Sequence, residues 1–158
     1  RLDNNQLGCY EYDYGCDPYG KDIFCCEIHC YDSADQCNGE IPQSIANLAK
    51  LKKLYLNKNH FLRGSIPDNI GDLSNLQTLY LEVNQLSGSI PESIGSLSNL
   101  ERLILQNNNL SGQIPESICT IVNLTMYLGY NRLCPGDAGY PVCFPVEQIA
   151  RQDCLPPP

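Results

Sequence analysis

The chain has 158 residues, of which 42% are apolar, so it is long enough for one domain with its own core. No apolar run approaches the roughly 18 residues of a membrane helix, and the formal net charge of -8 disfavours phosphate backbones and anionic lipids, so neither membrane insertion nor nucleic-acid binding is expected. Ten cysteines gather near the two ends, which favours an oxidising compartment and predicts a secreted, extracellular protein.

Residues 1–38 are predicted to form an acidic, cysteine-rich N-terminal cap, since residues 1–40 hold nine acidic residues against only Arg1 and Lys21. An even number of cysteines in the cap predicts that they form disulfides with one another, in a connectivity that the sequence does not fix. They are Cys9, Cys16, Cys25, Cys26, Cys30 and Cys37. A zinc site at Cys25, Cys26, His29 and Cys30 is a weaker alternative, because zinc ligands normally come as two separated pairs. We therefore expect no metal and no cofactor.

Aromatic and acidic residues alternate between Cys9 and Tyr19. This period of two predicts a cap strand whose tyrosines pack on the first repeat. Alternatively, the tyrosines form an assembly surface, since tyrosine offers a large contact area at low entropic cost. The residues concerned are Tyr10, Tyr12, Tyr14 and Tyr19. Calcium binding by the intervening carboxylates is disfavoured, because their spacing does not match an EF-hand loop.

Residues 39–131 contain an internal repeat, L-x-x-L-x-L-x-x-N, whose copies begin 25 and then 24 residues apart. Three copies are complete: Leu51/Leu54/Leu56/Asn59, Leu76/Leu79/Leu81/Asn84 and Leu100/Leu103/Leu105/Asn108. A fourth, degenerate copy begins at Leu124 and reaches Asn131 one residue early, with Tyr127 and Leu128 in the places of leucines. Because one repeat cannot bury its leucines alone, the copies are predicted to stack around one core.

A second signature, G-x-I-P, follows each copy, as in Gly88-Ser-Ile90-Pro91. The L-x-L segments predict a parallel sheet, and the Ile-Pro segments predict a second extended strand on the convex side. The asparagines that end the repeats are predicted to form a buried ladder that hydrogen-bonds to loop backbone. These ladder residues are Asn59, Asn84, Asn108 and Asn131.

The combined pattern L-x-x-L-x-L-x-x-N-x-L-x-G-x-I-P, from about Gly39 to Asn131, resembles the plant-type leucine-rich repeat of polygalacturonase-inhibiting proteins and receptor-kinase ectodomains. The resemblance implies an α/β solenoid in the form of a short right-handed horseshoe. A parallel β-sheet would line its concave face, 3-10 or short helical segments its convex side, and disulfide-bonded caps both ends. It also implies a place at the cell surface or in the cell wall. The chain departs from the family in having no tryptophan and only about three full repeats.

The residues between the strand leucines are predicted to point away from the core and to line the concave face. Tyr55, Tyr80 and Ile104 form one column, with Lys53, Thr78, Arg102 and Met126 on one side, and Asn57, Glu82, Gln106 and then Lys58, Val83, Asn107, Tyr130 on the other. This mixture of aromatics, amides and charges is typical of a contact surface for a protein or a glycan. Alternatively, the tyrosines only pack across neighbouring strands.

Two N-x-S/T sequons predict N-glycosylation in a secreted chain, at Asn109-Leu110-Ser111 and at Asn123-Leu124-Thr125. Asn109 is the better candidate, because it directly follows a ladder asparagine and is expected to face solvent.

Residues 132–158 are predicted to form a C-terminal cap with a proline-rich tail. Four cysteines serve this cap and are expected to pair with one another: Cys119, Cys134, Cys143 and Cys154. Leu155–Pro158 favours extended polyproline II, either as a disordered end or as the start of a proline-rich stalk.

The sequence contains only two histidines and no catalytic motif, so it predicts no enzyme. The predicted function is that of an extracellular binding module that recognises a protein or a cell-wall polysaccharide on its concave face. The alternative is a structural subunit of an extracellular filament or matrix that self-associates head to tail through its unlike caps. An ice-binding role is disfavoured, because the convex positions vary.

Overall fold

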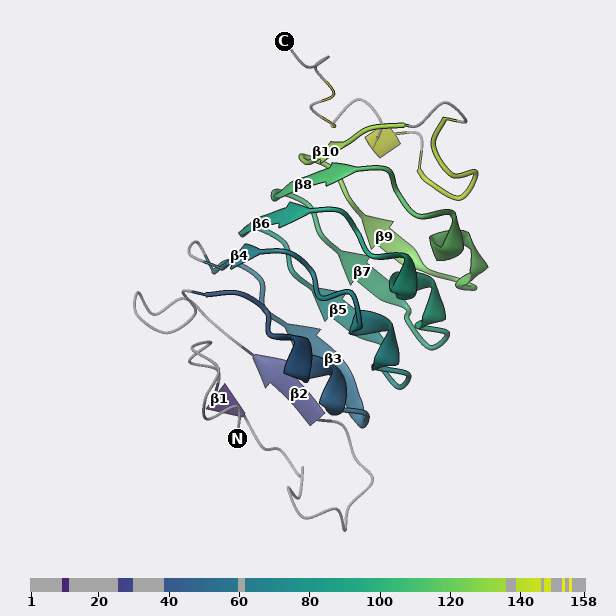
Figure 1. The fold of residues 1–158 in the computed structure, drawn as a ribbon. Coiled ribbons are helices and arrows are strands. Elements are labelled where there is room, and N and C mark those ends of the chain that lie inside the picture. The colour runs from purple at the N-terminus through teal and green to yellow at the C-terminus, as the bar shows by residue number, and fades with distance from the viewer. Residues whose placement is uncertain are drawn as a thin grey trace.

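A computed structural model describes residues 10–11, 26–29, 39–59, 62–135, 139–145, 147–148, 152 and 154 (Figure 1). Successive repeats stack along one axis and form a short solenoid with two parallel layers of strands. The main sheet has six strands in the order β1 (Tyr10–Glu11), β2 (Cys26–His29), β3 (Leu51–Tyr55), β5 (Thr78–Tyr80), β7 (Arg102–Ile104) and β9 (Thr125–Tyr127). All neighbours pair in parallel except β1 and β2, which are antiparallel.

The second sheet contains four short strands in the order β10 (Arg132–Leu133), β8 (Asn109–Gly112), β6 (Gln85–Gly88) and β4 (Arg63–Gly64). The prediction of a second strand in each repeat is therefore confirmed, but its position was wrong. The strands occupy the segment before the Ile-Pro pair, and β6 and β8 end at glycines with φ of +76° and +82°. Glycine adopts this left-handed region at little cost, so the chain can turn there towards the interior.

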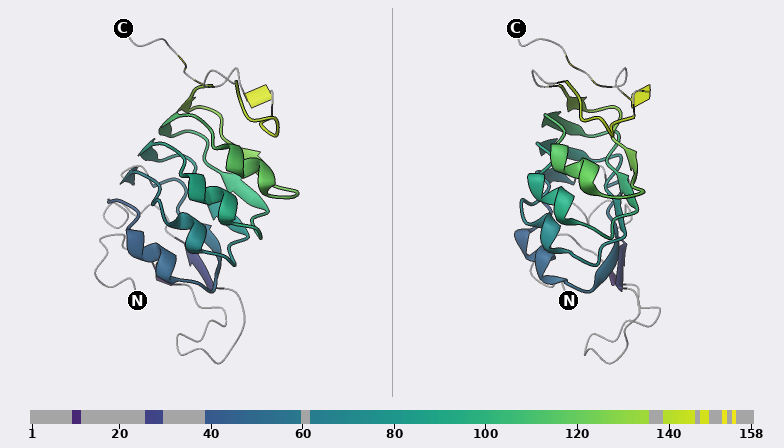
Figure 2. Two further views of the ribbon diagram at one scale, coloured as in Figure 1. Left: turned by 45° about the vertical axis from the view of Figure 1, so that its right-hand side comes forward. Right: turned by 90° about the vertical axis from the view of Figure 1, so that its right-hand side faces the viewer.

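Four 3-10 helices lie on the side of the solenoid opposite the main sheet (Figure 2). They are η1 (Gln43–Asn47), η2 (Ile70–Asp72), η3 (Glu92–Ser96) and η4 (Glu116–Thr120). Each buries one isoleucine in the core, which confirms the predicted short helical convex side.

Small residues allow the 3-10 helices to approach one another closely. Gly71 and Gly95 occupy the same position of successive repeats, and a Cβ at Gly95 would lie 2.6 Å from the backbone oxygen of Ser117 in the next repeat. A Cβ at Gly71 would similarly collide with the backbone of Ser93. Cys119 takes the corresponding position in the last repeat, where it forms a disulfide instead of meeting a further repeat.

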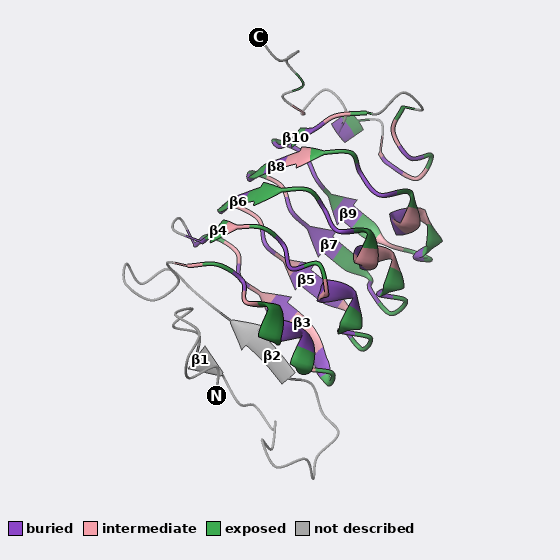
Figure 3. Ribbon diagram, in the orientation of Figure 1, coloured by how far each residue is buried: buried purple, intermediate pink, exposed green. Residues whose placement is uncertain are grey.

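The repeat leucines and isoleucines form one continuous core between the two layers (Figure 3). Leu54, Leu79 and Leu103 are paired in register on β3, β5 and β7, and each is fully buried. Stacking thus buries a column of side chains that no single repeat would cover.

The fourth repeat departs from its predicted alignment. Met126, expected on the concave face, pairs with Leu103 and is only 6% exposed, whereas Tyr127, expected in a leucine position, pairs with Ile104 and is 48% exposed. The missing residue of this repeat lies before the strand. Side chains alternate along a strand, so an alignment started at Leu124 places every side chain of β9 on the wrong face, whereas one counted back from Asn131 does not.

The asparagine ladder is confirmed. The backbone N–H of Asn59 donates to Asn84 Oδ1 at 2.8 Å, and Asn84 Nδ2 donates to the carbonyl oxygens of Leu56 and Leu81, both at 2.8 Å. Asn108 and Asn131 repeat the pattern, each bridging its own strand to the preceding one. Each buried amide thereby satisfies backbone groups that the turns leave without strand partners.

A second asparagine series on the surface was missed in the sequence. Asn75 Nδ2 donates to the carbonyl oxygen of Ala49, and Asn99 Nδ2 donates to that of Ser74. Both residues belong to the segment L-S-N-L, which precedes β5 and β7. The repetition of this segment was a usable signal for a further link between repeats.

Two disulfides attach the C-terminal cap, Cys119–Cys143 and Cys134–Cys154, each with a Cα–Cα distance of 5.5 Å. The predicted pairing within the C-terminal group is therefore confirmed, and its connectivity is now defined. Among the described residues, no helix has the length and apolar character required to cross a bilayer.

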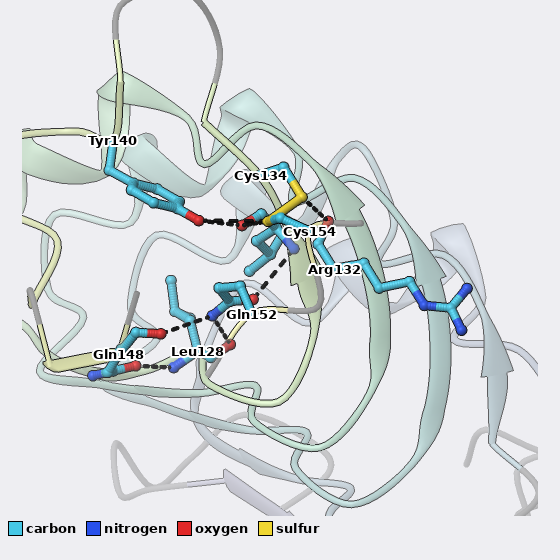
Figure 4. Close-up of a disulfide and its surroundings, with 8 residues drawn as sticks. Leu128, Arg132, Cys134, Tyr140, Gln148, Gln152 and Cys154 are labelled. Carbon is cyan, nitrogen blue, oxygen red and sulfur yellow. Dashed lines mark hydrogen bonds between the residues drawn. A yellow bond between two sulfur atoms is a disulfide. The ribbon is translucent and has the colours of Figure 1, made fainter. Parts of the chain in front are cut away.

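Side-chain amides of the C-terminal cap cover the outer edge of β9, where no further repeat pairs (Figure 4). The backbone N–H of Leu128 donates to Gln148 Oε1 at 2.6 Å, and Gln148 Nε2 donates to the carbonyl oxygen of Met126 at 2.9 Å. Gln152 in turn donates to the carbonyl oxygen of Leu128 and accepts from the N–H of Leu133. A glutamine amide carries one donor side and one acceptor, so these two residues replace the backbone of an absent strand.

In the predicted N-terminal cap, Cys26–His29 forms strand β2 and extends the main sheet by pairing with β3. Tyr10 lies in β1, in line with the predicted cap strand. Tyr12, Tyr14 and Tyr19 lie outside the described residues, as do Cys9, Cys16, Cys25, Cys30 and Cys37. The predicted disulfides and assembly surface of this region therefore stay predictions.

Candidate functional site

The outward side of strands β3, β5, β7 and β9, which we call the concave face, brings the predicted binding residues together in columns. Lys53 pairs with Thr78, Thr78 with Arg102, and Arg102 with Thr125. The adjacent column contains Tyr55, Tyr80, Ile104 and Tyr127. Thr125 and Tyr127 were missed as concave residues because of the alignment error in the fourth repeat.

The columns differ in how far their members are exposed. Thr78 and Ile104 are only 5% and 9% exposed, so they form the floor of the face and offer little area to a partner. Arg102 is exposed, and Lys53, Asn57 and Gln106 are partly exposed. A partner would therefore meet the basic and amide side chains before it reached the floor.

Aromatic rings dominate the middle of the concave face. The rings of Tyr55 and Tyr80 meet edge to face, with centroids 5.1 Å apart and an interplanar angle of 89°. This contact agrees with the alternative that strand tyrosines pack across neighbouring strands, but it leaves both residues partly exposed. Tyr127 and Tyr130 add two exposed rings in the last repeat.

Glu82 is a partly buried acid on the concave face. Burial raises the pKa of its carboxyl above the ordinary value, and this effect outweighs its own backbone N–H, the charge of Lys58 and a hydrogen bond with Asn57, all of which lower the pKa. Oε2 of Glu82 is buried and has no hydrogen-bond partner in the part of the chain that the structure describes. The site therefore contains a carboxylate that is incompletely satisfied when ionised.

Replacing Glu82 with glutamine is expected to stabilise the protein at neutral pH. The raised pKa means that the native state binds a proton more tightly than the unfolded state, so this group's contribution to stability is present in acid and is lost as the pH rises through the native pKa. Chemical denaturation of wild type and Glu82→Gln across pH tests this. The midpoints should converge in acid and separate towards neutral pH, and a midpoint of the variant that stays below wild type throughout would contradict the assignment.

The outermost predicted column lies in the turns that end the strands. Lys58, Val83, Asn107 and Tyr130 have φ between 57° and 60°, the left-handed region that most residues avoid. Asparagine tolerates this conformation, whereas β-branched valine does not. Val83, as the β-branched member, is therefore the most strained residue of the column.

Replacing Val83 with asparagine is expected to raise the free energy of unfolding by about 0.5–1 kcal/mol, because it relieves backbone strain at φ 58°. Urea unfolding measures the change. Val122→Asn is the control, since Val122 is 78% exposed and does not have a positive φ. Equal changes in both variants would show that surface polarity, not backbone strain, is responsible.

Both sequon asparagines are exposed. Asn109 lies at the start of β8, and Asn123 lies in a turn with φ of 60° before β9. Their N-glycosylation stays a prediction, and each site is open to a glycan.

A separate groove of about 460 Å³ lies beside the 3-10 helices and is lined mainly by the Ile-Pro segments. It contains the carboxylates of Asp68 and Glu92, and Ser117 Oγ donates to Glu92 Oε2 at 3.1 Å. The sequence predicted no cleft here. Within the described residues no histidine lines this groove, and no cluster of three or more potential metal ligands is found.

The parallel main sheet, the 3-10 convex side and the asparagine ladder define a leucine-rich-repeat protein of the plant type. Residues 23–127 match the family model described as the LRR domain of EGF-like domain-containing protein ComC, so the chain belongs to this leucine-rich-repeat family. The match begins within the predicted N-terminal cap and includes β2. No curated protein matches the chain.

Solved structures that resemble the chain are ectodomains of plant receptor kinases. The Arabidopsis thaliana receptor kinase GASSHO1/SCHENGEN3, in complex with CASPARIAN STRIP INTEGRITY FACTOR 2, is 48% identical over 60% of this chain, with a TM-score of 0.58. The plant peptide hormone receptor RGFR1, in complex with RGF2, is 41% identical over 60%, with a TM-score of 0.58. The BIR3–SERK2 complex from Arabidopsis thaliana is 34% identical over 80%, with a TM-score of 0.62.

The chain is much shorter than the receptors that it matches. It spans 11% of the GASSHO1/SCHENGEN3 chain, 15% of the RGFR1 chain and 64% of the matched chain in the BIR3–SERK2 complex. The similarity therefore defines the repeat and its stacking, and the choice of partner must come from the residues of this chain.

Proposed function

We propose that the chain is a non-catalytic extracellular module that binds a protein or peptide partner on its concave face. The observation that carries this proposal is the row of partly exposed rings at Tyr55, Tyr80 and Tyr127, flanked in register by basic and amide side chains. Tyrosine and arginine are enriched at protein interfaces, where their area and donors contribute most of the binding energy.

The comparisons support a polypeptide partner. Two of the similar receptors were solved with a partner named in their descriptions, CASPARIAN STRIP INTEGRITY FACTOR 2 and RGF2. The disulfides of the C-terminal cap support an extracellular place, because such bonds persist in oxidising compartments. We also propose that the protein is located in the cell wall or the extracellular matrix.

A random peptide library displayed on phage and selected against the oxidised protein tests the proposal. We expect the enriched peptides to lose binding to Tyr80→Ala, because Tyr80 lies in the central ring column and contacts Tyr55. Val142→Ala is the control, since Val142 is 97% exposed in the C-terminal cap. Failure to enrich any peptide, or equal loss in both variants, would contradict a concave binding face.

Cell-wall polysaccharides and a second copy of the chain are the alternative partners. Exposed rings also stack on sugars, so the same two variants should be tested on a glycan array. For head-to-tail assembly, Gln148 and Gln152 already occupy the outer edge of β9, which disfavours strand addition at that end. Assembly would then depend on side-chain contacts, with Tyr10, Tyr12, Tyr14 and Tyr19 as the proposed surface.

A further inference from the structure

The charge on the concave face is opposite in sign to that of the whole chain. The chain carries a net charge of -8, yet on β3, β5 and β7 and in the turns that follow them the concave columns contain three bases and one acid: Lys53, Lys58, Arg102 and Glu82. One further acid, Glu27 of β2, is paired in register with Lys53 at the edge of this region. Because burial raises the pKa of the Glu82 carboxyl, the acid opposes these bases less as the pH falls. A basic region attracts anionic partners, and on an acidic protein these include the acidic surface of a second copy.

Two of the three bases, Lys53 and Arg102, lie in one column beside the rings, whereas Lys58 lies on the other side. Lys53 and Arg102 share a column with Thr78 between them, so their backbones are two strand spacings, about 10 Å, apart. The guanidinium of Arg102 is exposed and makes no hydrogen bond or ion pair with another described residue. It is therefore available to a carboxylate, with which a guanidinium forms paired charge-assisted hydrogen bonds.

The columns next to the bases would bind uncharged groups of the same partner, not its carboxylates. Beside the bases lies the column of Tyr55, Tyr80, Ile104 and Tyr127, which offers rings and one apolar floor residue. Beyond it, Asn57 and Gln106 offer amides that pair with a peptide backbone. A partner that is complementary to all three columns must carry amides and must have acidic groups that alternate with apolar groups.

Resting on the proposed function, we infer that the partner is an acidic polypeptide segment bound in extended form across β3, β5, β7 and β9, with carboxylates on the Lys53–Arg102 column and apolar side chains on the tyrosine column. The four strands cover about 15 Å from first to last, which about five extended residues span. A uniformly charged acidic polysaccharide fits less well, because it has no apolar groups for the rings and Ile104.

Binding of three short synthetic peptides tests this inference. In the first, aspartate alternates with valine; in the other two, asparagine or lysine replaces aspartate. Fluorescence anisotropy with the full oxidised chain, at low and physiological salt, should show the aspartate peptide binding about tenfold more tightly than the asparagine peptide, and the lysine peptide binding most weakly.

Three variants locate the effect. Arg102→Glu is expected to weaken binding of the aspartate peptide about tenfold, whereas Glu82→Gln should strengthen it, because removing this acid makes the face more positive. Arg132→Glu makes the same charge change at an exposed position of β10, on the second sheet, and should leave the affinity nearly unchanged.

The contrary outcomes are distinguishable. Equal binding of the three peptides, or equal losses in Arg102→Glu and Arg132→Glu, would overturn the acidic-partner inference. If the phage-selected peptides were neutral or basic and their binding still depended on Tyr80, the acidic-partner inference would be overturned but the proposed function would stand. Tighter binding of oligogalacturonate than of the aspartate peptide, or self-association of wild type that Arg102→Glu abolishes, would assign the face to a polysaccharide or to a second copy instead.

Discussion

Asn84→Ala is expected to lower the free energy of unfolding by about 2 kcal/mol, because it leaves the buried backbone N–H of Asn59 without its acceptor. It also removes one of the two amide donors that each of the carbonyl oxygens of Leu56 and Leu81 receives, and leaves only those of Asn59 and Asn108. Asn84 accepts from the N–H of Asn59 and donates to the carbonyl oxygens of Leu56 and Leu81, so its loss affects two repeats. The residue is only 8% exposed, and water does not readily replace its amide.

Urea unfolding followed by circular dichroism measures this loss, and Asn99→Ala provides the matched control. Asn99 also links its repeat to the preceding one through a carbonyl oxygen, at 2.8 Å from Ser74, but it lies on the surface. Its replacement should cost less than about 1 kcal/mol, since water takes the place of the amide. Similar losses in the two variants would show that burial does not decide the strength of the ladder.

Gly95→Ala is expected to cost about 2 kcal/mol, although alanine is the better residue for a helix. The new Cβ would lie 2.6 Å from the backbone oxygen of Ser117 and 2.5 Å from its Cβ, so η3 and η4 would have to move apart. Such a movement separates core residues of two repeats, including Ile94 and Ile118. Thermal and urea unfolding both report the change.

Two further variants separate backbone from side-chain contact. Ser117→Gly in the Gly95→Ala background removes the Cβ contact but not the contact with the backbone oxygen, so it should restore little of the lost stability. Ser96→Ala, at an exposed position of the same helix, should change stability by less than about 0.5 kcal/mol. Full rescue by Ser117→Gly would mean that the backbones are not in close contact.

The stacked core and the asparagine ladder were predictable because both follow from a strict spacing. Leu54, Leu79 and Leu103 recur at the same place in each repeat, and a column of buried leucines is the arrangement that satisfies them all. The fourth repeat was misread because its deletion lies before the strand, so that Met126 and Tyr127 exchanged faces. The ladder asparagine, whose role is fixed by hydrogen bonds, was the more reliable reference point.

The details of the concave face and of the C-terminal cap depend on contacts that spacing does not encode. Thr78 and Ile104 occupy outward positions, yet neighbouring strands leave them almost fully covered. Gln148 and Gln152 close the sheet edge through hydrogen bonds to Met126 of β9 and Leu133 of β10, about 20 positions earlier, and neither glutamine belongs to a repeat. Nor does a count of four cysteines distinguish Cys119–Cys143 from the other pairings.

In the last 3-10 helix, Cys119 stands at the position that glycine occupies in the two preceding helices. This difference restricts where whole repeats can be added to or lost from such a chain. Gly71 and Gly95 each accept a following repeat, whereas the position of Cys119 is already joined to Cys143. If a repeat were duplicated between the second and third full repeats, the 3-10 helix before it would present a glycine, which leaves space for the helix of the new repeat. Both caps would then be kept. A unit appended after the cap disulfide would find neither a free sheet edge nor space at the helix, so repeats are expected to be gained and lost from the middle of the chain.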